Sequence, residues 1–160
     1  MNEKLHKYIL SWIEKANHDL KCVALILNSN DIDLPLDVAC FHCQQSAVKL
    51  IKAYLVYSDV EFPHTHNLAD LIDFCIQKDE TFTDYQKKLE NLTPFAVEIR
   101  YPDYSYYPTI NDAQESYQLV LDFKKFIKNK MKDLFEFKYF GLISFYISRY
   151  IIFNRKDLLI

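Results

Sequence analysis

The residues best suited to chemistry gather around Arg100, in the segment RYPDYSYYPTI at 100–110. An arginine guanidinium can form two parallel hydrogen bonds with one phosphate, and Asp103 can accept a hydrogen bond from a ribose or a base. The neighbouring aromatic side chains can stack on bases; they are Tyr101, Tyr104, Tyr106 and Tyr107. The segment therefore predicts a site for a nucleotide or RNA. A structural role also fits, in which Arg100 pairs with Asp103 or Glu98 and the tyrosines pack as a corner.

A second group of donors lies on one predicted helix. Gln45, Lys49 and Lys52 follow one another at spacings of four and three residues, which places them on one helical face. We expect this face to help bind a phosphate. His66, in the sequence Thr-His-Asn, is a further candidate, and the same position also suits a hydrogen-bonding residue at the start of a helix.

The cysteines and the N-terminal sequence bear on metal binding and compartment. Cys40 and Cys43 form a C-F-H-C run, which is half of a zinc motif, but no second ligand pair follows at a suitable spacing. The first residues, MNEKLHKYIL, do not have the pattern of a secretory signal. We therefore expect reduced thiols, a cytoplasmic location, and neither a metal nor a cofactor.

Composition and periodicity predict helices. The chain has 160 residues with only one Gly and five Pro, too few turn residues for an all-β protein of this length. Apolar residues recur at steps of three and four, and Asn111 with Gln114 forms a plausible capping pair for the last long helix. The expected helices cover residues 3–27, 35–57, 67–78, 82–99 and 112–134. Residue Pro94 predicts a kink or a break within the fourth of them.

These elements define a fold class and two regions. We expect an all-α, antiparallel up-and-down bundle of four to five helices over residues 1–134. Residues 135–160 form an apolar extension whose structure the pattern leaves open. Its core, YFGLISFYISRYIIF, is too short and too polar for a membrane span, which needs about 20 apolar residues, so no membrane association is expected.

Charge and surface patterns suggest partners. Residues 1–120 hold 10 Lys and Arg against 18 Asp and Glu, whereas residues 121–160 hold 9 against 4. The basic end suits RNA or an acidic partner, and it equally suits a solvated helix face. Phe41, Val48 and Val56 lie outside the main apolar stripe of their helix, so we expect this helix to be buried on more than one face, either centrally or at a dimer contact. Together with the apolar C-terminal extension, these residues predict a homodimer.

Four blocks of the chain together resemble the HEPN family (higher eukaryotes and prokaryotes nucleotide-binding domain). The blocks are WIEKANHDLKCVALIL at 12–27, ACFHCQQSAVKLIKAYLV at 39–56, EFPHTHNLADLI at 61–72 and AVEIRYPDY at 96–104. The resemblance covers about residues 5–132. It implies a bundle of four to five helices, usually dimeric, which in many members is paired with a minimal nucleotidyltransferase as a toxin and antitoxin.

Other members of that family are metal-independent ribonucleases with an Arg and a His separated by four to six residues. The resemblance assigns the Arg to Arg100, but positions 105 to 107 are Ser105, Tyr106 and Tyr107. A tyrosine, with a reference pKa of about 10, is a poor substitute for an imidazole in proton transfer near neutral pH. The sequence thus favours a binding or interaction module without ribonuclease activity. Two alternatives stay open: a ribonuclease toxin that uses His66 or Tyr106, and a dimeric helical scaffold without a ligand.

Overall fold

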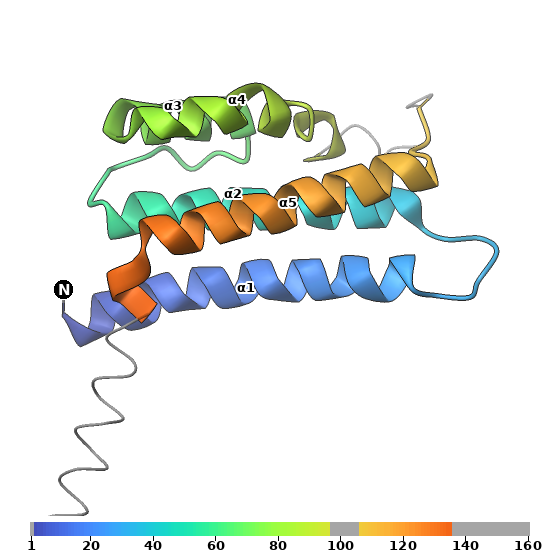
Figure 1. The fold of residues 1–160 in the computed structure, drawn as a ribbon, viewed down its shortest axis with the longest axis horizontal. Helices are drawn as coiled ribbons and strands as arrows, with labels where there is room; N and C mark the ends of the chain where they lie inside the picture. Colours follow the sequence, from blue (N-terminus) through green and yellow to red (C-terminus); the bar gives the residue numbers. More distant parts are fainter. Residues whose placement is uncertain (1, 97–105, 136–160) are drawn as a thin grey trace, which may run out of the picture.

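Two long helices form the base of the structure, a computed structural model that describes residues 2–96 and 106–135. Helix α1, Glu3–Leu27, begins where the side chain of Asn2 accepts a hydrogen bond from the backbone N–H of Leu5. Helix α2, Leu36–Tyr57, runs antiparallel to α1 after a short loop (Figure 1). Both helices match the predicted ranges to within one residue.

Helix α2 is the central element of the bundle. It packs against α1 on one side and against helices α3 (Leu68–Lys78) and α5 (Ile110–Lys130) elsewhere on its surface. Figure 1 shows α5 alongside α2 and running in the same direction, with α3 and α4 on the side away from α1. The described residues contain no strand, so the predicted all-α bundle is confirmed.

The chain between α3 and α5 differs from the prediction of one helix over 82–99. The 3-10 segment η1 (Glu80–Phe82) leads into α4 (Thr83–Glu90), and a second 3-10 segment, η2 (Thr93–Ala96), follows. The helix breaks just before Pro94, whose ring would clash with the preceding turn of a continuous α-helix.

The aromatic ring of Phe82 is fully buried between α2 and α5, 4.5 Å from the ring of Tyr54 and 4.9 Å from that of Phe126.

Helix α5 starts two residues earlier than predicted because a different pair of residues caps it. The side chain of Thr109 accepts from the backbone N–H of Asp112, and the carboxylate of Asp112 accepts from the backbone N–H of Thr109. The predicted pair, Asn111 with Gln114, is therefore wrong. Thr109 and Asp112 are a Thr and an acidic residue three positions apart, the pattern of a capping box.

Two further predictions concern the apolar residues of α2 outside its main stripe and the C-terminal extension. Val48 is only 1% exposed because its side chain packs within this chain, so of the two alternatives for this residue central burial is the one observed, and the homodimer stays a prediction. Leu134 still belongs to the core, but residues 136–160 lie outside the described residues, and the predicted extension remains a prediction. No helix in the described ranges is long and apolar enough to cross a membrane.

The capping box gives a first test. We expect Thr109→Ala to lower the free energy of unfolding by about 1 kcal/mol, because the side-chain cap is lost at the start of α5. Asn111→Ala, on the exposed first turn of the same helix, is the matched control and should change it by less than about 0.5 kcal/mol. Urea denaturation measures both. A larger loss for Asn111→Ala than for Thr109→Ala would contradict the cap described here.

Candidate functional site

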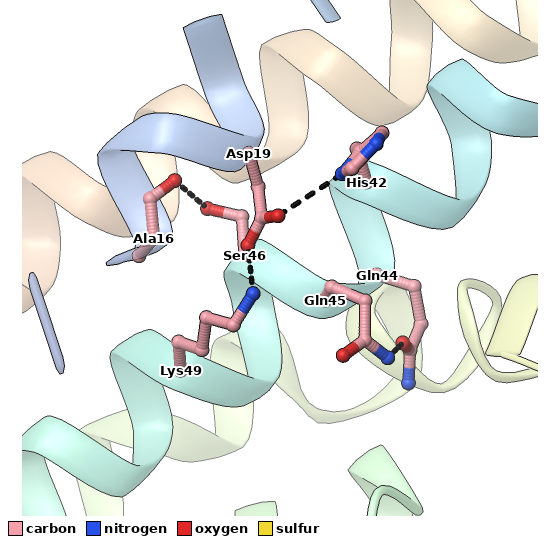
Figure 2. A network of polar contacts seen from close by, with 7 residues as sticks. All are labelled: Ala16, Asp19, His42, Gln44, Gln45, Ser46 and Lys49. Carbon is pink, nitrogen blue, oxygen red and sulfur yellow. Dashed lines mark hydrogen bonds and ion pairs between the residues drawn. The ribbon is translucent and has the colours of Figure 1, made fainter. Parts of the chain in front are cut away.

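The most distinctive polar cluster lies where α1 meets α2, around the carboxylate of Asp19. Asp19 is only 7% exposed. One carboxylate oxygen forms an ion pair with the Nζ of Lys49, and the other lies 3.0 Å from the Nδ1 of His42 (Figure 2). A buried carboxylate is strongly disfavoured unless cations or hydrogen bonds compensate its lost hydration. Lys49 and His42 supply that compensation from α2.

Helical spacing explains how α2 reaches Asp19 with two side chains. His42 and Lys49 are seven residues apart, so two helical turns bring them to nearly the same face. Between them, the hydroxyl of Ser46 donates to the backbone oxygen of Ala16 at 3.0 Å. Small side chains at these two positions let the helices approach closely, and Asp19 lies about one turn further along α1 (Figure 2).

The hydrogen bond with Asp19 determines which nitrogen of the His42 ring carries the proton. A carboxylate can only accept, so Nδ1 must carry the proton in this hydrogen bond. In the neutral ring, Nε2 then holds the lone pair. The side chain of His42 is 26% exposed, so a ligand can reach the ring. Asp19 therefore orients an imidazole in the way that a carboxylate orients a functional histidine in many sites.

Lys52, one turn beyond Lys49, is a cation without an acidic partner among the described residues. It is 6% exposed, and its Nζ lies 5.8 Å from the centre of the Trp12 ring. Burial lowers the pKa of Lys52, because it disfavours the charged ammonium. The indole N–H of Trp12 is also buried and has no acceptor within the described residues. An ammonium without a counterion among the described residues suits an anion.

We call the face formed by His42, Gln45, Lys49 and Lys52 the cationic edge of α2. Their spacings of three, four and three residues keep them on one side of the helix. The structure thus brings three sequence-predicted residues together with His42. Sequence reasoning grouped Gln45, Lys49 and Lys52 on one helical face. In the structure Lys49 reaches Asp19 of α1 and Lys52 is buried over Trp12 of α1, whereas Gln45 turns towards Gln44 (Figure 2).

The neighbouring glutamines tie this edge to the loop before α3. The amide of Gln45 donates to the side-chain oxygen of Gln44 at 2.7 Å (Figure 2). Gln44 is fully buried and donates to the backbone oxygen of His66 at 2.8 Å. His66 is thus positioned by its backbone next to α2. Asn67, which follows it, caps α3 with its side chain, so the start of α3 depends on Asn67 rather than on His66.

The remaining predicted residues lie in or beside the Arg100 segment. Arg100, Tyr101, Asp103 and Tyr104 are outside the described residues, so their proposed roles stay predictions. Tyr106 is 45% exposed and lies just before α5.

The carboxylate of Asp112 in the first turn of α5 is held in its charged form. A hydrogen bond from the Thr109 side chain, with smaller contributions from the Thr109 backbone and the Tyr106 hydroxyl, lowers the pKa of Asp112.

The cysteines of α2 have the properties of core residues. Cys40 and Cys43 are fully buried. Burial raises the pKa of the Cys40 thiol to about 12 and that of Cys43 further still, because a thiolate is costly in an apolar environment. In the described part of the chain, no group of three or more His, Cys, Asp or Glu side chains converges to hold a metal ion. These thiols contribute packing.

Sequence reasoning missed Asp19 and left His42 without a role. Asp19 carried a usable signal, because it is a charged residue within the apolar stripe of α1, between Ala16 and Val23. A carboxylate at such a position needs a partner from another element. The partners lie on a different helix, and local patterns do not identify contacts of that range.

The arrangement defines a class: a helical domain built on an antiparallel helix pair with a polar cluster across its seam. The model of the HEPN domain family matches residues 9–130. The chain therefore belongs to the HEPN family, as the four sequence blocks predicted. No curated protein and no solved structure matches the chain.

A buried charge cluster makes a clear stability prediction. Asp19→Ala should lower the free energy of unfolding by about 2 kcal/mol, less than for a fully buried pair because Lys49 and His42 are partly exposed. Asp122→Ala is the matched control, since Asp122 pairs with Lys125 on the exposed surface of α5, and it should change stability by less than about 0.5 kcal/mol. Urea titration of both variants compares them; equal losses would show that the Asp19 cluster is no more than a surface ion pair.

Proposed function

We propose that this HEPN domain binds the phosphates of a nucleotide or an RNA strand along the cationic edge of α2, without cleaving them. The observation that carries the proposal is Lys52, whose side chain is 6% exposed and whose charge no acidic side chain neutralises within the described residues. Burial makes the charged form of this side chain less favourable, and a bound anion would offset that cost.

The rest of the edge fits the same ligand. Lys49 has three N–H donors, and its ion pair with Asp19 leaves others for a phosphate. Gln45 adds a neutral amide donor. Arg100, Tyr101, Asp103 and Tyr104 are proposed to complete the site with bidentate phosphate binding and base stacking.

The absence of histidine at positions 105 to 107 supports binding over cleavage. In the resemblance drawn above, the ribonucleases of this family need that imidazole. In the same proposal the chain acts as a homodimer and as the partner of a minimal nucleotidyltransferase in a toxin–antitoxin pair. Light scattering on the purified chain measures the first. Co-purification from its natural host tests the second: a minimal nucleotidyltransferase should be recovered, and a monomer that recovers no such protein would contradict both.

Lys52 allows binding to be separated from folding. Lys52→Met keeps a long side chain against Trp12 and removes the charge. We expect the dissociation constant for a fluorescein-labelled oligoribonucleotide to rise about tenfold, as for loss of one charge-assisted hydrogen bond. The free energy of unfolding should stay equal or increase, because the lowered pKa of Lys52 is a cost of folding. That cost is full at neutral pH and disappears as the pH rises through the folded pKa towards the unfolded value.

Fluorescence anisotropy measures the binding, and Lys125→Met is the matched control, because Lys125 is 74% exposed on α5. The control should change the dissociation constant much less than Lys52→Met does. Unchanged RNA binding by Lys52→Met would refute the role of the edge. The same RNA on a denaturing gel tests the ribonuclease alternative: cleavage that His66→Ala or Tyr106→Phe abolishes would replace this proposal.

A further inference from the structure

Most of the large apolar side chains that the described residues expose lie at one end of the bundle. This end is formed where α1 finishes and where α2 and α5 begin (Figure 1). The exposed residues there are Leu25, Ile32, Val38, Tyr106, Tyr107 and Ile110, whereas Tyr8 lies near the start of α1. Single exposed apolar residues are normal on a protein surface, but their concentration in one region indicates an interaction site.

The same end is acidic. Residues 22–48 and 106–123 contain no Lys or Arg. They do contain Asp31, Asp33, Asp37, Asp112 and Glu115 near this end, which we call the acidic end. The contact of Cys40 with Ser116, and the effect of both Asp37 and Asp112 on the pKa of Cys40, show that the starts of α2 and α5 lie together.

Helix starts and turns explain why some of the acidic residues occur at the acidic end, but they do not explain the exposed apolar residue between them. Asp37 and Asp112 lie in the first turns of α2 and α5, where the helix dipole favours acidic residues. Asp31 accepts a weak hydrogen bond from the backbone of Asp33, as turn residues do. Ile32, between them, is 102% exposed and packs against none of the described residues. An apolar side chain flanked by two acids at a loop tip needs another explanation.

A hollow beside the start of α5 adds a place for an anchor. It has a volume of about 410 Å³ and lies between α4, η2 and α5. Leu92, Phe95 and Leu119 line it together with the carboxylates of Asp112 and Glu115 and the ammonium of Lys88. The three apolar side chains suit the stem of an Arg or Lys side chain, and Glu115 suits its charged head, since Asp112 already accepts from Thr109.

We propose that the acidic end is a docking surface for a partner protein whose own face combines basic and apolar side chains. Charge complementarity selects this occupant. A nucleic acid would be repelled by the five carboxylates, and a second copy joined through the same end would bring like charges together. The surface is separate from the cationic edge of α2, so the proposal does not depend on phosphate binding.

The test uses a probe of the stated chemistry: a fluorescein-labelled amphipathic helical peptide that repeats Leu and Lys. We expect the purified chain to bind it. Asp31→Lys combined with Asp33→Lys should weaken binding about tenfold, and Ile32→Ser should weaken it several-fold. Ile32 is fully exposed, so its variant should fold normally, which circular dichroism checks. Amide shifts in a two-dimensional NMR titration should be confined to residues 25–38, 88–95 and 106–119.

Matched controls come from the rest of α1. Tyr8→Ser removes an exposed aromatic ring elsewhere, and Glu14→Lys reverses an exposed charge; neither should weaken peptide binding. Absence of binding, equal binding by all variants, or equal losses in the controls would overturn the proposal. Stronger binding to phosphatidylcholine vesicles than to the peptide, lost in Ile32→Ser, would assign the surface to lipid instead. RNA binding should be the same for Ile32→Ser and wild type, which separates this test from that of Lys52.

Discussion

Burying the carboxylate of Asp19 is the constraint around which the α1–α2 pair is arranged. A carboxylate that is 7% exposed loses most of its hydration and must recover it from fixed partners. Lys49 and His42 do this from two successive turns of α2. A register slip of either helix would separate the charges, so the cluster favours one alignment of the pair over the others that apolar packing alone would tolerate.

The same constraint shapes the chemistry of the edge. Because Asp19 neutralises Lys49 and holds the His42 ring by Nδ1, the polar side chains of α2 are preorganised rather than free to rotate. Lys52 lies one turn further on, without a carboxylate of its own within the described residues and with Trp12 beneath it. An ammonium over an aromatic face keeps part of its electrostatic stabilisation, but a ring cannot replace a counterion. Lys49 is therefore already neutralised by Asp19 and adds only its remaining N–H donors to a ligand, whereas the charge of Lys52 is left for the ligand to neutralise.

The sequence predicted the helices well and the site only in part. The bounds of α1 and α2 were accurate because long apolar periodicity and a nearby Asn or Pro mark them clearly. The cap of α5 was assigned to Asn111 instead of Thr109, because several capping residues occur within a few positions and the pattern does not distinguish them. Gln45, Lys49 and Lys52 were correctly grouped on one face. That the face packs along α1 could not be deduced, since helix pairing is a tertiary property.

The acidic end and the cationic edge carry opposite charges, so each favours a different class of partner. The acidic end carries five carboxylates on segments without Lys or Arg, while the cationic edge has an unneutralised ammonium in its described surroundings. An RNA strand bound along α2 would gain energy at Lys52 and lose it on approaching the start of α2, where Asp37 lies. The carboxylates of the acidic end therefore favour a basic partner there, whereas Lys52 favours an anion along α2. Because Arg100 and Tyr104 precede Tyr106 closely in the chain, an RNA strand and a basic partner protein would meet where the Arg100 segment joins the acidic end.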